Sequence, residues 1–107
     1  MNLLTNERRY ATWTVTSKQP LSSAPQVAYR KFGDQDWTWL SSDWNGPDQV
    51  NAEGNHVRRC SALFCGPDAV GSGASVLGPG KYETQIRYTD AVEIIAAETG
   101  EIHVTTI

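Results

Sequence analysis

Alternation of side chains with a period of two is the feature that most limits what this chain can fold into. In residues 81–88 (KYETQIRY), every second residue is aromatic, aliphatic or threonine, and the residues between them are charged or amide-bearing. Successive side chains of a β-strand point to opposite faces, so this pattern predicts a strand with one buried and one solvated face. The same alternation recurs in residues 11–16 (ATWTVT) and, near the end, in residues 102–106 (IHVTT).

Turn signals separate these segments from two more candidate strands, residues 27–32 and 57–65, which are rich in β-forming residues. The turns combine Gly, Pro, Asn and Asp, and they are Gln19-Pro20, Ala24-Pro25, Gly33-Asp34, Asn45-Gly46-Pro47, Gly66-Pro67-Asp68 and Gly78-Pro79-Gly80. Several short strands with frequent turns are typical of a sandwich or a barrel. We predict an all-β fold in one domain spanning residues 1–107, with residues 1–8 as a candidate N-terminal arm.

Residues 91–99 allow two interpretations. Asp90 and Glu93 have the spacing of a helix capping box, and Gly100 suits the end of a short helix. The alternative is a hairpin, with one strand over 92–98 and the next over 101–107. We favour the hairpin because the segment lies between two alternating segments and is short for a helix that must be stable by itself.

The charge balance is slightly acidic, with 9 Lys and Arg against 12 Asp and Glu and a formal net charge of −3. Nucleic acids and anionic membranes favour basic surfaces, so neither is expected as a partner. No apolar run approaches the roughly 20 residues that cross a bilayer. The first ten residues lack the apolar stretch of a secretory signal, and we expect the chain to be made in a cytoplasm.

The sequence contains no pattern that points to catalysis, a cofactor or a metal. Cys60 and Cys65 have no second ligand pair downstream, and we expect two unlinked, reduced cysteines. Asp34 and Asp36 lack the further ligands of a calcium loop. There is no Gly-x-Ser-x-Gly elbow to present a serine and no phosphate-binding loop. We therefore predict a protein that is not an enzyme, with no catalytic, cofactor-binding or metal-binding residues.

The four tryptophans are the residues most informative about function. Trp13 lies in an alternating segment and is expected in the core. Trp37 and Trp39 share one face of a predicted strand, and Trp44 precedes a turn, which favours its exposure. Large aromatic side chains carry much of the energy of protein interfaces. We name Trp37, Trp39 and Trp44 as interface candidates; the alternative is that they form an aromatic platform for a sugar.

Gly80 and Tyr82 predict a structural corner. A glycine gives the backbone freedom at the bend, and a tyrosine two residues later can bury its ring while its hydroxyl binds a nearby backbone group. The tyrosine corner of sandwich domains has this form. A surface-binding role for Tyr82 is the alternative.

The C-terminal half also carries a series of short motifs. They are Gly80-Lys81-Tyr82 at the start of a strand, then Ile86-Arg87-Tyr88-Thr89-Asp90, then Glu93, and finally Gly100 before an alternating segment. This series resembles a family of small virion proteins of tailed bacteriophages that infect actinobacteria, in which the motifs read G-x-Y, V-R-x-T-D, Glu and Gly. The family often has two tryptophans where Trp37, Trp39 and Trp44 stand. The resemblance covers roughly residues 35–107. Val92 stands where the family often has Pro, and residues 60–65 lie outside the pattern.

The resemblance implies an immunoglobulin-like antiparallel β-sandwich of about seven short strands. It further implies a structural protein of the virion that binds the capsid surface, as decoration, or the head–tail connector, in multiple copies. The expected partners are therefore capsid or head–tail connector proteins. The alternative function is a small recognition module that binds carbohydrate or a host surface at the phage tail.

Overall fold

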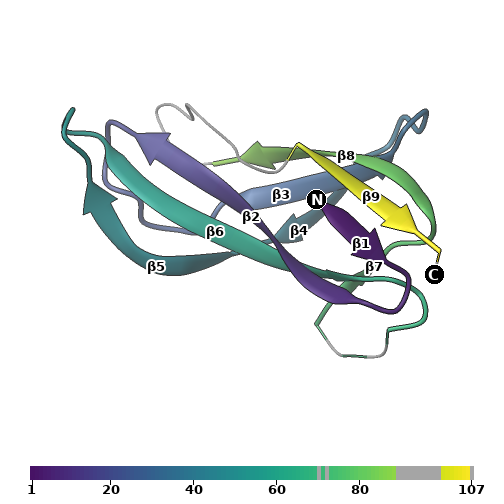
Figure 1. Ribbon diagram of the computed structural model, residues 1–107. Helices are drawn as coiled ribbons and strands as arrows, with labels where there is room; N and C mark the ends of the chain where they lie inside the picture. The colour runs from purple at the N-terminus through teal and green to yellow at the C-terminus, as the bar shows by residue number, and fades with distance from the viewer. Residues whose placement is uncertain (70, 72, 89–99, 107) are drawn as a thin grey trace.

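The computed structural model describes residues 1–69, 71, 73–88 and 100–106, and this part of the chain is all-β, as the alternation predicts (Figure 1). One sheet has five strands in the order β1-β9-β8-β3-β4. Its strands are β1 (Asn2–Leu4), β3 (Gln26–Lys31), β4 (Thr38–Ser41), β8 (Gly80–Arg87) and β9 (Glu101–Thr105). The second sheet has four strands, which are β2 (Arg8–Ser17), β5 (Asp43–Val50), β6 (His56–Cys65) and β7 (Ser75–Val76). In this sheet β6 pairs with β2, β5 and β7.

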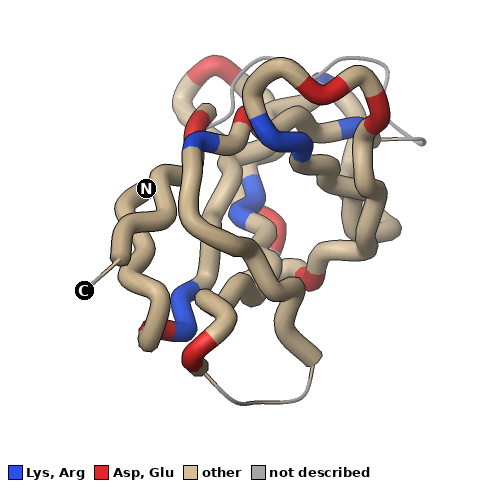
Figure 2. Tube along the Cα trace, turned by 90° about the vertical axis from the view of Figure 1, so that its right-hand side faces the viewer, with Lys and Arg blue, Asp and Glu red and all other residues tan. Residues whose placement is uncertain are grey.

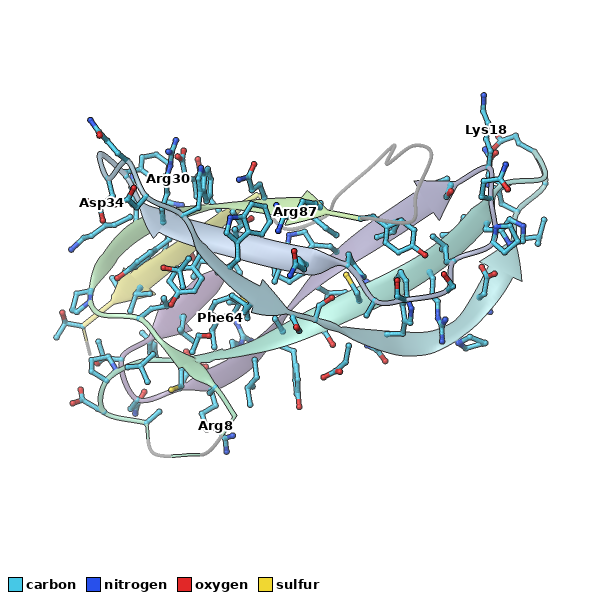
Figure 3. The ribbon with its side chains drawn as sticks, turned by 180° about the vertical axis from the view of Figure 1, so that it is seen from behind. Arg8, Lys18, Arg30, Asp34, Phe64 and Arg87 are labelled. Carbon is cyan, nitrogen blue, oxygen red and sulfur yellow. The ribbon has the colours of Figure 1, made fainter. Side chains whose placement is uncertain are left out.

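The two sheets pack face to face as two layers (Figures 1 and 3). The alternation explains which side chains meet between them. Along β2, Ala11, Trp13 and Val15 are buried, while the threonines between them are partly exposed. Their buried partners from elsewhere in the chain include Leu3, Val27, Phe64, Leu77, Ile102 and Val104. Each such side chain stabilises the fold by about 1.5–3 kcal/mol when it is fully buried.

The longest ladder of the fold joins β2 to β6. All ten residues of β2 pair antiparallel with β6, from Arg8 opposite Cys65 to Ser17 opposite His56. Trp13 lies opposite Cys60, and Cys60 in turn lies opposite Trp44 of β5. This row of three residues crosses the four-stranded sheet on its inner face, because Trp13 and Cys60 are both fully buried.

Two predicted boundaries differ from the structure. Residues 1–8 contain β1, which pairs in parallel with β9, and Leu3 is buried in the core, so this segment is part of the sandwich rather than an arm. The prediction of a turn at Asn45-Gly46-Pro47 is wrong, because β5 runs through these residues. The register of β5 against β6 shifts between Asn45 and Gln49, and Gly46 has a φ of +100°. The strand therefore absorbs the Gly-Pro pair as a bulge.

The choice between helix and hairpin for residues 91–99 lies outside the described residues. Strand β9 does begin at Glu101, which agrees with the last predicted strand. No helix long and apolar enough to cross a membrane occurs in the described part of the chain.

Candidate binding surface on the five-stranded sheet

Trp37 and Trp39 both lie on the outer face of the five-stranded sheet. Along β3, Val27 and Tyr29 face inwards, and Tyr29 makes an edge-to-face contact with Phe64 of the opposite sheet. Ala28 and Arg30 therefore face outwards, and the register places Trp39 opposite Ala28. Only Trp39 lies in β4, whereas Trp37 precedes this strand, so the two tryptophans lie on one face of the sheet without sharing one strand. We call Trp37, Trp39, Arg30 and Arg87 the tryptophan face.

Arg30 covers Trp37. The guanidinium carbon of Arg30 lies 4.2 Å from the centroid of the Trp37 ring. Arg30 also forms an ion pair with Glu83, its register partner on β8, and donates a hydrogen bond of 3.3 Å to the carbonyl oxygen of Gln35. The side chains of Arg30 and Glu83 are about one-third exposed, at 29% and 34%. The charge of Arg30 is thus balanced within the protein.

Arg87 covers Trp39 in the same way, with its guanidinium carbon 4.1 Å from the ring centroid. Arg87 is on β8 and Trp39 is on β4, so the pair must span β3, which lies between them. Ala28, on the outer face of β3 at this point, has an exposed fraction of only 1%. Its small side chain leaves room for the tryptophan ring to extend across β3 towards Arg87. Figure 3 shows Arg30 and Arg87 pointing away from Phe64, which lies between the layers.

Trp44 has a different environment, and the expectation of an exposed Trp44 is wrong. Its side chain is half-buried on the inner side of β5 and packs against the core. The indole N–H donates a hydrogen bond of 3.1 Å to the carbonyl oxygen of Ser22, and the ring lies 5.9 Å from that of Tyr88. Arg58 covers the remaining side, 4.8 Å from the ring centroid. Trp44 therefore packs at the open end of the sandwich. Its exposure was expected because Asn45-Gly46-Pro47 predicts a turn, whereas these residues form a bulge within β5.

The sequence analysis missed the three arginines. Arg30, Arg58 and Arg87 each lie over one of the three candidate tryptophans, whereas Trp13 is fully buried, as expected. Significant cation–π pairs occur roughly once per 70–80 residues, so three such contacts within the described part of the chain is a high density. The available signal was the alternation in residues 81–88, which places Arg87 on the solvated side of its strand.

Gly80 and Tyr82 form the predicted corner. Gly80 has a φ of +142°, a conformation that favours glycine, and an added Cβ would lie 2.7 Å from the Lys31 side chain. The Tyr82 ring is buried, and its hydroxyl donates a hydrogen bond of 2.9 Å to the carbonyl oxygen of Gly78. Its structural role is confirmed, and a surface-binding role does not fit an exposed fraction of 8%.

Both cysteines are free and buried, as the sequence analysis predicts. Burial raises the pKa of the Cys60 thiol, and a hydrogen bond with Ser42 offsets part of this rise. Among the described residues, no group of three or more His, Cys, Asp or Glu side chains is placed to hold a metal ion.

Ser17, His56 and Asp48 come together at one end of the four-stranded sheet, although not as a catalytic triad. Ser17 lies opposite His56 in the ladder, and His56 Nδ1 is 2.9 Å from Asp48 Oδ2. The Ser17 side chain is fully buried, and its hydroxyl accepts a hydrogen bond of 3.1 Å from the N–H of Gln19. A substrate cannot reach this hydroxyl, so the cluster connects β5 to β6 and offers no accessible nucleophile.

Basic and acidic positions are interspersed along the strands and turns rather than gathered by sign (Figure 2).

Against known proteins, no family model, no curated protein and no solved structure matches this chain. The tryptophan face is therefore identified as a candidate binding surface from its geometry alone.

Proposed function

We propose that this chain is a non-enzymatic binding domain that assembles with another protein through its tryptophan face, as a structural component of a tailed-phage virion. The main support for this binding surface is the pair of tryptophan–arginine stacks on one outer face, Trp37 with Arg30 and Trp39 with Arg87. Tryptophan and arginine are the residue types most enriched among interface hot spots. The virion, with a capsid or head–tail connector protein as the partner, is proposed from the resemblance of the C-terminal motifs.

The immunoglobulin-like class implied by that resemblance is supported by the strand order. Immunoglobulin domains have the order A-B-E-D in one sheet and strands C, F and G in the other, where variable-type domains add C′. The order β2-β6-β5 aligns with B-E-D, and β9-β8-β3-β4 aligns with G-F-C-C′. Tyr82, near the start of β8, occupies the place of the tyrosine corner at the start of strand F.

The arginines favour a protein partner over a sugar. A sugar-binding platform needs a tryptophan ring with an open face, on which the sugar ring stacks. Each ring of the tryptophan face already has one side occupied by a guanidinium, at 4.1–4.2 Å from the centroid. A protein interface needs no such opening, because it buries on the order of 800 Å² per partner over a broad area.

The test is the copy number of the protein in purified phage particles, measured by quantitative proteomics. The variant Trp37→Ala with Trp39→Ala should be at least about tenfold depleted, because truncation of a hot-spot residue costs about 2 kcal/mol or more. The matched control is Tyr10→Ala, since Tyr10 is an aromatic residue on the other sheet and is 65% exposed. Both variants must first melt as a single folded species.

Each outcome is informative. Depletion of the tryptophan variant alone supports the proposal. Normal incorporation of the folded tryptophan variant would remove the tryptophan face from the interface. Absence of the wild-type protein from purified particles would overturn the virion assignment.

A further inference from the structure

The two arginines of the tryptophan face differ in how their charge is balanced. Arg30 forms an ion pair with Glu83, so its positive charge is compensated inside the protein. Arg87 has no such partner among the described residues: its Nε and Nη2 donate to one neutral acceptor, Gln26 Oε1. The residue is exposed, so its positive charge faces the solvent beside the Trp39 ring.

The side chain of Arg87 is also held in position before any partner arrives. Trp39 supports the guanidinium plane from one side, at 4.1 Å, and Gln26 binds its Nε edge, with 3.1 Å between Nε and Oε1. An arginine that is already ordered loses less side-chain entropy when it binds. Gln26 occupies the edge formed by Nε and Nη2, and the other edge, formed by Nη1 and Nη2, suits a carboxylate, which accepts two parallel hydrogen bonds from it.

We propose that Arg87, supported by Trp39, binds a carboxylate side chain of the protein partner. This inference rests on the proposed function of the tryptophan face and adds the chemistry of the partner: an acidic residue placed to meet Arg87. Arg30 is not the recognition residue, because a partner carboxylate would have to compete with Glu83 for it. Recognition by a charged hydrogen bond at Arg87 makes binding sensitive to salt, since the residue is solvent-exposed in the free protein.

The first experiment needs no knowledge of the partner. The probe is hexaglutamate, with hexaglutamine as the uncharged control, titrated in the millimolar range into the purified full chain labelled with ¹⁵N. We expect hexaglutamate to shift the NMR signals of the Arg87 Nε–H and the Trp39 indole N–H, and hexaglutamine to leave them in place. Arg87→Gln should abolish the shift of the Trp39 signal.

The matched control is Arg9→Gln, which removes the same charge from an arginine whose side chain is 54% exposed and which lies on β2 of the other sheet. This variant should leave the Trp39 shift unchanged. Shifts that are equal at Arg9 and Arg87, or no shift at Arg87 at all, would overturn the inference.

The second experiment measures incorporation into particles. Loss of a hydrogen bond to a charged group costs enough to reduce binding about tenfold, so Arg87→Gln and Arg87→Glu should both be depleted, the second more strongly. Arg87→Lys keeps the positive charge but loses the planar pair of guanidinium N–H donors. Its copy number in particles should therefore lie between those of these two variants and that of the wild type.

The two proposals fail in different ways. If the tryptophan variant is depleted while Arg87→Glu is incorporated normally, the face binds the partner but the carboxylate inference is wrong. If hexaglutamate binds at Arg87 while the tryptophan variant is incorporated normally, the recognition chemistry holds and the proposed place of the protein in the virion does not.

Discussion

The hydroxyl of Tyr82 donates a hydrogen bond of 2.9 Å to the carbonyl oxygen of Gly78, four residues earlier in the chain. This bond closes the bend that leads into β8, the strand that carries Glu83 and Arg87 to the outer face. The corner is therefore part of what positions the tryptophan face, although it lies on the inner side of the same strand.

Removal of this hydroxyl should weaken the fold by a modest amount. Tyr82→Phe keeps the buried ring and loses one hydrogen bond, so the free energy of unfolding should fall by about 1 kcal/mol. Urea denaturation followed by tryptophan fluorescence measures this change. Tyr10→Phe, at a tyrosine that is 65% exposed, is the control and should leave the midpoint where it is. An equal effect of both variants would show that the bond to Gly78 contributes nothing.

The same tyrosine predicts how stability responds to alkaline pH. Burial raises the pKa of Tyr82, with a further rise from Tyr29, so the folded protein holds the phenolic proton more tightly than the unfolded chain does. The stabilisation from this difference is complete below the unfolded pKa of about 10 and is lost as pH rises above it. The stability gap between wild type and Tyr82→Phe should therefore shrink above about pH 10. A gap that stays constant from neutral pH to beyond this range would contradict the prediction.

Trp13 should be the most sensitive single position of the core. Its side chain is fully buried between the sheets, so Trp13→Ala removes a large apolar volume and should cost about 3–5 kcal/mol. Total stabilities of about 5–15 kcal/mol leave little margin after such a loss. Trp13→Phe should cost less, because the indole N–H of Trp13 has no hydrogen-bond partner among the residues that the structure describes. Guanidinium denaturation measures the free energy of unfolding of both variants. Equal losses in Trp13→Ala and Trp13→Phe would contradict the prediction.

Trp44 should behave as a packing residue rather than as a contact for a partner. Trp44→Ala removes the hydrogen bond to Ser22 and the ring contact with Tyr88, so we expect a loss of about 2 kcal/mol or more in the free energy of unfolding. Trp37→Ala, at a residue on the outer face, should cost less than half of this. Thermal melting of the two variants side by side decides the order, and a larger effect at Trp37 would reverse our assignment of the two residues.

The cysteines should be unreactive in the native protein. Cys60 and Cys65 are both fully buried, and burial raises the pKa of Cys60, which reduces the reactive thiolate further. Ellman's reagent should detect neither thiol in buffer and both thiols in urea. Intact-mass measurement without reductant should give the mass of two free thiols. Rapid labelling of the folded protein would show that the sandwich opens around β6.

The segments with a clean period of two were predicted well from the sequence, because alternation is a local property of a strand. Strand β1 was not, since the burial of Leu3 depends on a parallel partner, β9, at the other end of the chain. The Gly46-Pro47 pair predicts a turn from local preferences, yet pairing with β6 on both sides of it keeps the segment in a strand.

The candidate surface was predicted in part. Trp37 and Trp39 could be placed on one face by their spacing. Their arginines could not, because the meeting of Arg87 with Trp39 depends on the order β8-β3-β4 and on a small residue, Ala28, at the crossing point. The inward orientation of Trp44 likewise follows from its register with Cys60, which no local pattern encodes.

The bulge in β5 also limits how copies of this protein can associate. An unpaired strand edge exposes backbone N–H and C=O groups on which another chain can build. At the middle of β5 the positive φ of Gly46 turns the backbone, and Pro47 has no N–H to donate. A strand arriving from a second molecule would meet an interrupted row of donors and acceptors there. The β5 edge therefore disfavours the extension of the sheet from one molecule into the next by strand pairing.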